Sequence, residues 1–223
     1  MSPDLAFALS LADDADAIAL GRFRAADLRV ETKPDLTPVS EADRAVEEAL
    51  RARLERERPR EPVFGEEGGG GDPSGWILDP IDGTRNYTRG IPVWATLIAC
   101  ADRLAVVSAP ALGRRWWAER GAGAFANGEP IRVSGIDRLD ESTLLYGLDR
   151  RPPARAWDAW HVRGFGDFWS HMLVAEGAAE AAFDAEGLAL WDTAPMKVIV
   201  EEAGGRFDGS VSWNGRLDLS ALR

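Results

Sequence analysis

The chain has few of the residues that build disulfides, zinc sites or membrane spans. Its 223 residues include one cysteine, Cys100, and two histidines. An internal disulfide is therefore excluded, and a zinc site of the usual nitrogen and sulfur ligands is hard to assemble. No apolar run approaches the about 20 residues of a membrane span, and the N-terminus lacks the basic-then-apolar layout of a signal peptide. We expect a cytoplasmic protein that contacts no membrane.

Positive charge is also scarce. The chain has 26 Lys and Arg against 37 Asp and Glu, a formal net charge of −11. Because a basic patch is the footprint of nucleic-acid binding, this balance argues against a nucleic-acid partner. It also disfavours a phosphorylated substrate, unless bound cations reverse the sign locally. A hydrophobic content of 45% predicts a globular core in one domain or two closely packed halves.

The most informative stretch is WILDPIDGT at residues 76–84. An apolar run, predicted as a strand, is cut off by Asp79 and Asp82 where the strand leaves the sheet. Pro80 stiffens the loop, and Gly83 lets the backbone come close to a ligand. Two carboxylates three residues apart repel each other unless a cation lies between them. The stretch therefore predicts a site for a hard cation such as Mg²⁺.

Two other interpretations of this stretch stay open. It could be a strand followed by an ordinary Asx-type turn. It could also be a variant of the D-x-D-G-T motif of aspartyl-phosphate phosphatases, in which the first Asp is a nucleophile. The D-x-x-D-G-T spacing seen here is one residue longer, which would aim the two carboxylates differently.

Further acids stand at three other places. Asp43 follows Ser40 by three residues at the start of a predicted helix, so a capping box explains it as well as a function does. Glu66 and Glu67 follow a predicted strand at residues 61–64, whose end could bring Glu66 beside the strand that ends at residue 79. Residues 190–195 open another predicted helix, so Asp192 lies at a helix N-terminus, a position that suits an N-cap or a nearby phosphate.

Together these blocks resemble the inositol monophosphatase-like, Mg²⁺-dependent and lithium-sensitive phosphatases. The matching blocks are GEE at residues 65–67, DPIDGT at 79–84, and WD at 191–192 with EAGG at 202–205. With Asp43 they span nearly the whole chain in the right order. Separated blocks in this order are a much more specific signal than any one of them.

The resemblance implies a role for each acid. The implied metal ligands are Glu66, Asp79, Asp82, Asp192, the backbone carbonyl of Ile81 and, as an additional ligand, Glu67. Thr84 and Asp43 would orient and deprotonate the attacking water. The resemblance implies a catalytic role for Glu66 as well. The N–H groups of Gly83 and Thr84 would hold phosphate oxygens. Two or more cations could then clamp the attacking and leaving oxygens of an in-line displacement.

Within the family, the chain looks most like the histidinol-phosphate phosphatase branch. The blocks that carry this likeness are KPDLTPV at residues 33–39, VSAP at 107–110, WW at 116–117 and RGFGDFW at 163–169. Asp167 could meet the cationic amino alcohol, or it could be an N-cap. Arg163 and either Asp184 or Glu186 are further candidates for contact with the substrate.

The resemblance implies an α+β fold, a layered αβαβα sandwich of the inositol monophosphatase and fructose-1,6-bisphosphatase type. We expect residues 1–138 to carry most metal ligands and residues 139–223 to form a smaller half that completes the site. The expected activity is Mg²⁺-dependent hydrolysis of L-histidinol phosphate. Inositol 1-phosphate or sugar phosphates remain alternatives, and a homodimer is left open. The short linker through Pro152 also leaves open a metal-binding homologue without turnover.

Overall fold

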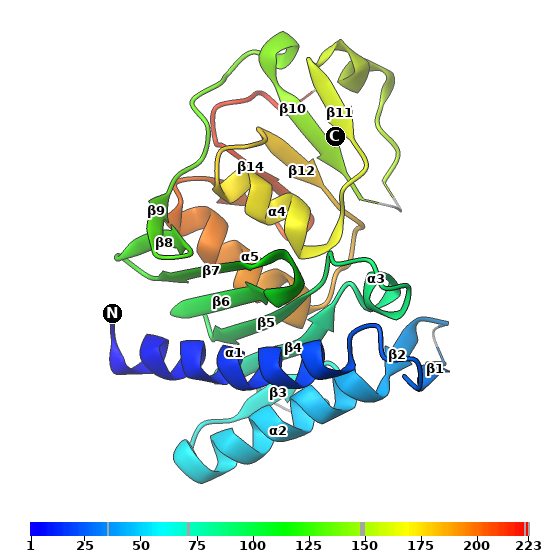
Figure 1. Cartoon of the computed structure of the whole chain (residues 1–223). Coiled ribbons are helices and arrows are strands. Elements are labelled where there is room, and N and C mark those ends of the chain that lie inside the picture. Colours follow the sequence, from blue (N-terminus) through cyan, green and yellow to red (C-terminus); the bar gives the residue numbers. More distant parts are fainter. Residues whose placement is uncertain (35, 71, 148–149, 221, 223) are drawn as a thin grey trace.

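The computed structural model describes residues 1–34, 36–70, 72–147, 150–220 and 222. Two helices, a seven-stranded sheet, two further helices and a five-stranded sheet follow one another as layers (Figure 1). This arrangement confirms the expected α+β sandwich. Asp35, within one of the blocks that resemble the histidinol-phosphate phosphatases, lies outside the described residues.

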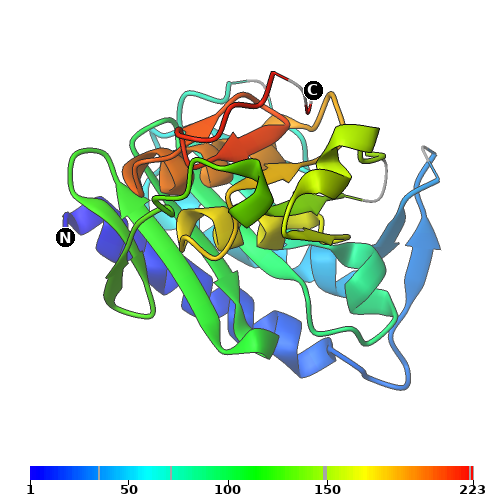
Figure 2. The ribbon, with the colours of Figure 1, turned by 90° about the horizontal axis from the view of Figure 1, so that it is seen from above.

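The first layer consists of α1 (Pro3–Arg22) and α2 (Glu41–Glu57). The apolar side of α1, which includes Leu11, packs with Leu50 of α2 and with Trp76 of the seven-stranded sheet. The capping box predicted for α2 is present, with Ser40 as N-cap. In the chain segment that connects the two helices, β1 (Val30–Thr32) and β2 (Pro38–Ser40) form a hairpin. It projects on the side of the molecule away from the N-terminus (Figure 2).

The seven-stranded sheet follows the chain order, and only its first pair, β3 and β4, is parallel. The register between β4 and β5 shifts between Asp79 and Asp82. Pro80 lies within this bulge and has no N–H to donate to the ladder, which explains the shift. The bulge turns the end of β4 out of regular pairing where the two aspartates lie. The strands are β3 (Val63–Gly65), β4 (Trp76–Asp82), β5 (Ala95–Cys100), β6 (Leu104–Ala109), β7 (Arg114–Glu119), β8 (Gly123–Ala126) and β9 (Glu129–Ile131).

Two helices, α4 (Asp167–Ala175) and α5 (Leu190–Glu202), lie between the two sheets (Figure 1). Ile199 of α5 packs with Leu97 and Val107 of the seven-stranded sheet, and Phe168 and Met172 of α4 join the same cluster. These contacts join elements from both predicted halves of the chain. The division at residues 138 and 139 stays a prediction.

The five-stranded sheet has the order β11-β10-β12-β14-β13. Its outer face is covered by short 3₁₀ turns and the C-terminal segment, where Ala156 and Leu217 pack on Phe183. The outermost layer of the sandwich is thus made of short turns. The strands are β10 (Thr143–Tyr146), β11 (His161–Arg163), β12 (Ala181–Phe183), β13 (Arg206–Phe207) and β14 (Val211–Trp213); the short helices are α3 (Thr84–Thr88), η1 (Pro110–Leu112), η2 (Leu139–Glu141) and η3 (Ala154–Asp158).

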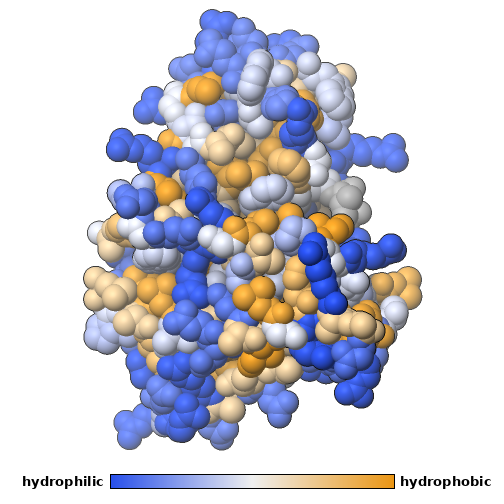
Figure 3. Space-filling model, in the orientation of Figure 1, coloured by the Kyte–Doolittle hydropathy of each residue, from blue (hydrophilic) through white to orange (hydrophobic). Residues whose placement is uncertain are grey.

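None of the helices in the described part of the chain combines the length and the apolar composition that a membrane crossing requires. On the face drawn in Figure 3, hydrophilic residues dominate the top and bottom, and apolar residues appear in patches across the middle.

Candidate functional site

A cavity of about 490 Å³ opens where the ends of β4 and β12 meet the first turns of α4 and α5. Several of the separated sequence blocks converge here, since residues of the GEE, DPIDGT and WD blocks line the cavity, as do residues of the blocks at 33–39 and 163–169. Thr84 and the backbone of Ile81 and Gly83 belong to the same wall. The acids that line the cavity are Glu66, Asp79, Asp82, Asp167, Asp184 and Asp192.

Three of these acids form a compact cluster. One carboxylate oxygen from each of Asp79, Asp82 and Asp192 lies within 4.8 Å of the other two. Backbone amides hold the first two, because Asp79 Oδ1 accepts from the N–H of Ile81 at 3.0 Å and Asp82 Oδ2 from that of Phe168 at 2.6 Å. The bulge in β4 and the start of α4 therefore aim both side chains into the cavity.

Asp192 belongs to the first turn of α5 but is not its N-cap. The cap is Ala189, and Asp192 is the third helical residue, with its Oδ2 accepting from the N–H of Ala189 at 3.1 Å. The expectation that residues 190–195 open this helix is thus confirmed, whereas the interpretation of Asp192 as its N-cap is wrong. The carboxylate still reaches back to the cap, and this contact fixes its direction toward the cavity.

The electrostatics of the cluster favour a bound cation. Burial, followed by the charges of Glu66 and Asp82, raises the pKa of Asp79 well above its ordinary value. Burial and the charge of Glu66 raise the pKa of Asp192 to about 6. A divalent cation reverses this penalty because it stabilises the ionised carboxylates. The all-oxygen donor set fits a hard ion such as Mg²⁺.

These shifts predict how pH changes the effect of Mg²⁺ on stability. A folded-state pKa of about 6 for Asp192, against an ordinary 3.8, means that the folded protein without metal holds the proton more tightly. That contribution to stability is present at low pH and is lost as pH rises through about 6. A divalent cation would bind the deprotonated cluster, so the stabilising effect of Mg²⁺ should grow over the same range. We expect Mg²⁺ to raise the melting temperature more at about pH 7.5 than at about pH 5. Equal shifts at both pH values, measured by calorimetry, would contradict the cluster as the cation site.

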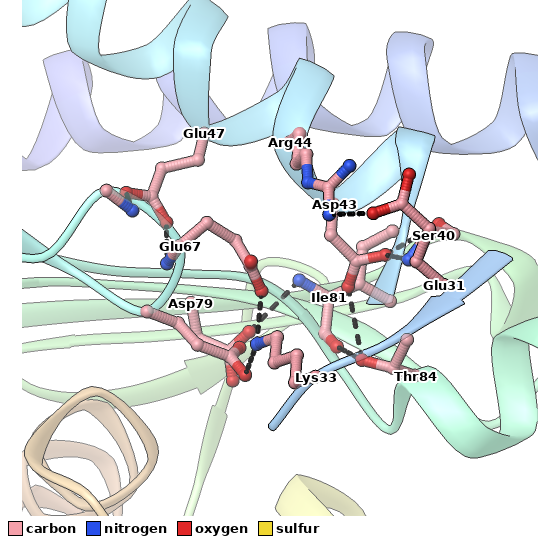
Figure 4. A network of polar contacts seen from close by, with 12 residues as sticks. Glu31, Lys33, Ser40, Asp43, Arg44, Glu47, Glu67, Asp79, Ile81 and Thr84 are labelled. Carbon is pink, nitrogen blue, oxygen red and sulfur yellow. Dashed lines mark hydrogen bonds and ion pairs between the residues drawn. The ribbon is translucent and has the colours of Figure 1, made fainter. Parts of the chain in front are cut away.

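Of the predicted pair, Thr84 lines the cavity and Asp43 contacts Thr84 from behind (Figure 4). The Thr84 hydroxyl is 3.1 Å from Asp43 Oδ1 and 2.9 Å from the carbonyl oxygen of Ile81. The other oxygen of Asp43 accepts from the backbone N–H and the hydroxyl of Ser40, at 2.8 and 2.6 Å. Burial raises the pKa of Asp43, and the bonds from Ser40 oppose that rise. The capping role and the contact with Thr84 thus occur together, one on each oxygen.

Glu66 and Glu67 share a cation supplied by the chain itself. Lys33 Nζ lies 2.7 Å from Glu66 Oε1 and 2.5 Å from Glu67 Oε1 (Figure 4). Burial acts to lower the pKa of Lys33, but the hydrogen bonds to Glu66 and Glu67 outweigh it and leave the pKa above its ordinary value. The ammonium therefore lies charged beside two of the residues implied as metal ligands.

Asp167 lies at the far side of the cavity and is the first residue of α4, with Gly166 as the N-cap. The interpretation of Asp167 as an N-cap is therefore wrong. Its φ of 55° is in the left-handed region, which Asp tolerates better than most residues. Asn86 Nδ2 donates to Asp167 Oδ2 at 3.3 Å and to the carbonyl of Val93 at 2.8 Å. Burial and the charge of Asp184 raise the pKa of Asp167 to about 6.

Of the two acids near residue 185, only Asp184 faces the cavity in the described structure. It is 8% exposed, and a Cβ on Gly147 would lie 2.3 Å from its Oδ1, so a glycine is needed there for the carboxylate to fit. Glu186 pairs at the surface with Arg150, and its side chain is 81% exposed. Arg163 is also exposed and bonds to the carbonyl of Val162. Neither Glu186 nor Arg163 lines the cavity.

Three residues around the site were missed as functional candidates from sequence: Lys33, Asn86 and Glu47. Lys33 lies in the KPDLTPV block at residues 33–39, but the sequence indicated no chemical role for it. Glu47 has a detectable signal, since it lies four residues after Asp43 and therefore on the same face of α2. Asn86 follows the DGT motif by two residues, without a local pattern that indicates its partner.

Comparison with known proteins agrees with this geometry. Residues 1–210 match the model of the inositol monophosphatase family. The chain is 46% identical to a histidinol-phosphatase of Streptomyces coelicolor over 92% of this chain and 86% of the relative. It is 48% identical to a histidinol-phosphatase of Mycobacterium tuberculosis over 91% and 86%. An IMPase from Thermotoga maritima superposes with a TM-score of 0.86 at 28% identity, over 96% of this chain and 93% of the other. With its sequence blocks converging on one acidic cavity, and with this match over most of its length, the chain belongs to the inositol monophosphatase family.

Proposed function

We propose that the protein is a Mg²⁺-dependent phosphomonoesterase that hydrolyses L-histidinol phosphate with an activated water. The observation that carries the proposal is the cluster of Asp79, Asp82 and Asp192 in the same cavity as Thr84, whose hydroxyl contacts Asp43. The histidinol-phosphatases among its relatives support the substrate.

The metal would be held by oxygen ligands around the cluster. When bound, Mg²⁺ lowers the pKa of a coordinated water and offsets the charge of the phosphate. Glu66 and the Ile81 carbonyl complete the set with the three clustered aspartates, and Glu67 is an additional ligand. For Glu66 and Glu67 to serve, the Lys33 ammonium must give way.

The remaining groups handle the proton and the phosphate. Thr84 Oγ1 takes a proton from the attacking water and passes its own to Asp43 Oδ1, which lies 3.1 Å away. The N–H groups of Gly83 and Thr84 hold phosphate oxygens at the start of α3. Gly83 has a φ of 82°, and a Cβ there would lie 3.0 Å from the Val93 carbonyl, so both backbone and space favour glycine.

The acids on the opposite wall of the cavity support a cationic substrate. Asp167 and Asp184 present two largely buried carboxylates, and an ammonium or imidazolium group would pair with them. A neutral polyol would bring no charge to either carboxylate, so this wall favours a cationic substrate over a neutral one. Glu186 and Arg163 are not part of this proposal because they lie at the surface.

We expect kcat/KM to be at least about 100-fold higher for L-histidinol phosphate than for inositol 1-phosphate, measured on one preparation. Asp184→Asn should lower the value for histidinol phosphate while changing that for inositol 1-phosphate little. Glu186→Gln is the matched control and should change neither. Equal values for the two substrates in the wild type would refute the substrate and leave a general phosphatase.

Removal of metal tests the reaction type. Phosphate release should stop after treatment with EDTA and return when Mg²⁺ is added, because the acidic cavity repels a phosphate without cations. Activity that survives complete metal removal would refute the proposal.

A homologue that binds metal without turnover is the second candidate, motivated by the short linker through Pro152. It predicts that Mg²⁺ raises the melting temperature while no member of a broad panel of phosphate esters is hydrolysed. The cytoplasmic location and the homodimer stay predictions, and light scattering tests the latter.

A further inference from the structure

Glu47 is a buried carboxylate of α2 that contacts the segment carrying Glu66 and Glu67. Its side chain is 2% exposed. Oε2 accepts from the backbone N–H of Glu67 at 2.7 Å, and Oε1 accepts from that of Gly68 at 2.7 Å. Arg51, one turn further along α2, donates from Nε to Oε1 at 2.7 Å and from Nη2 to the carbonyl of Gly69 at 2.5 Å. Two side chains of one helix thus bind three successive residues of the loop.

The loop sequence is adapted to this approach. A Cβ on Gly65 would lie 2.6 Å from Glu47 Oε1, and one on Gly68 would lie 2.7 Å from Arg51 Nε and 2.8 Å from Glu47 Oε1. Neither glycine has a positive φ, so backbone conformation does not require them. Glycine is required at both positions because Glu47 and Arg51 approach too closely to leave room for a Cβ.

Burying a carboxylate is costly unless it is paired and hydrogen-bonded. Glu47 meets that condition only while the loop keeps its present path, since two of its three bonds come from loop amides. Any loop conformation that turns Glu66 and Glu67 elsewhere leaves Glu47 short of donors. Glu47 also lies one helical turn from Asp43, so the same helix face carries the partner of Thr84.

We propose that Glu47 is a positioning residue that fixes the Glu66 and Glu67 segment in the orientation needed to bind metal. The inference rests on the proposed function, because it takes these two acids as ligands. Glu47 does not touch the metal or the substrate. It acts through the backbone of residues 67 and 68, with Arg51 holding the carbonyl of residue 69.

Glu47→Gln tests this with nearly unchanged shape. The amide offers one acceptor where the carboxylate offers two, and its NH₂ group faces an N–H or the Arg51 guanidinium. We expect faster hydrogen exchange at the amides of Glu67 and Gly68 in the metal-free protein. The Mg²⁺ dissociation constant should rise by about 10- to 100-fold, the usual effect of losing a residue that orients ligands. At saturating Mg²⁺, kcat should stay within about threefold of the wild type, because bound metal restores the loop.

The matched control is Glu48→Gln, the same change at the exposed neighbour on α2, which should alter neither exchange nor Mg²⁺ affinity. Gly68→Ala reaches the same contact from the loop side with Glu47 intact, and it decides the matter if Glu47→Gln fails to fold. It should also weaken Mg²⁺ binding, whereas Gly135→Ala, where a Cβ meets nothing within 4 Å, should not.

The outcomes separate this inference from the proposed function. If the wild type binds Mg²⁺ and releases phosphate but Glu47→Gln and Gly68→Ala keep wild-type affinity, only the role of Glu47 is overturned. If the wild type binds no Mg²⁺ in calorimetry, both are overturned.

Discussion

Asp79→Asn is expected to lower kcat/KM by at least about 10³-fold, because several kcal/mol of charge stabilisation depend on the metal. Asp79 is 1% exposed and belongs to the cluster with Asp82 and Asp192. Asparagine can still accept from the N–H of Ile81, so the loop should keep its path. What is lost is one of the negative charges that hold the cation.

The same substitution should leave the metal-free protein at least as stable as the wild type. Burial and the neighbouring acids raise the pKa of Asp79, so removing its charge relieves repulsion. Calorimetric Mg²⁺ titration and melting curves with and without Mg²⁺ measure both effects. Wild-type Mg²⁺ affinity in this variant would show that Asp79 is not a ligand.

Asp43→Asn should slow the reaction by about 10² to 10⁴-fold, the usual contribution of a general base, with a smaller effect on Mg²⁺ affinity. The amide oxygen can keep the bonds from Ser40, which turns the NH₂ group toward Thr84. Thr84 then faces the amide NH₂ group and loses the carboxylate that would take its proton. Because Asp43 contacts Thr84 and Ser40, the substitution should affect the cluster of Asp79, Asp82 and Asp192 only through these neighbours.

Comparing the two variants separates a metal ligand from a residue that orients the water. The decisive measurement is the Mg²⁺ dissociation constant in each variant under identical conditions. If Asp43→Asn loses as much Mg²⁺ affinity as Asp79→Asn, the assigned role of Asp43 is wrong.

Local signals in the sequence were sufficient for the parts of the site that lie close together along the chain. The capping box at Ser40 placed Asp43, and the DPIDGT stretch placed a strand end with Asp79, Asp82 and Thr84 beside each other. The layered fold came from the order of blocks and the family resemblance. These features depend on residues a few positions apart, where spacing alone limits the geometry.

The rest depends on contacts between distant segments. Lys33 meets Glu66 across 33 residues, and Asn86 meets Asp167 across 81. Local patterns do not indicate which hairpin folds over which loop. The interpretation of Asp167 as an N-cap failed for a different reason, because a left-handed residue at Asp167 opens α4 and gives no periodic signal.

The sequence did not indicate which of Asp184 and Glu186 faces the cavity, although the two acids are only two residues apart. Asp184 directly follows β12, so the strand still directs its side chain into the cavity. Two residues later the chain has turned, and Glu186 faces solvent. Both are acids at a strand end, and only the path of the turn distinguishes them.

The Lys33 ammonium ties the β1–β2 hairpin to the segment that carries Glu66 and Glu67. Because a tethered cation already neutralises part of this acidic region, the β1–β2 hairpin can dock on the loop during folding while no metal is present. If Glu66 and Glu67 are ligands as proposed, Mg²⁺ must compete with an ammonium whose local concentration is high, since the chain holds it in place. In the proposed ligand set, metal loading at these two acids would therefore be an exchange of cations, in which the hairpin gives up its Lys33 anchor.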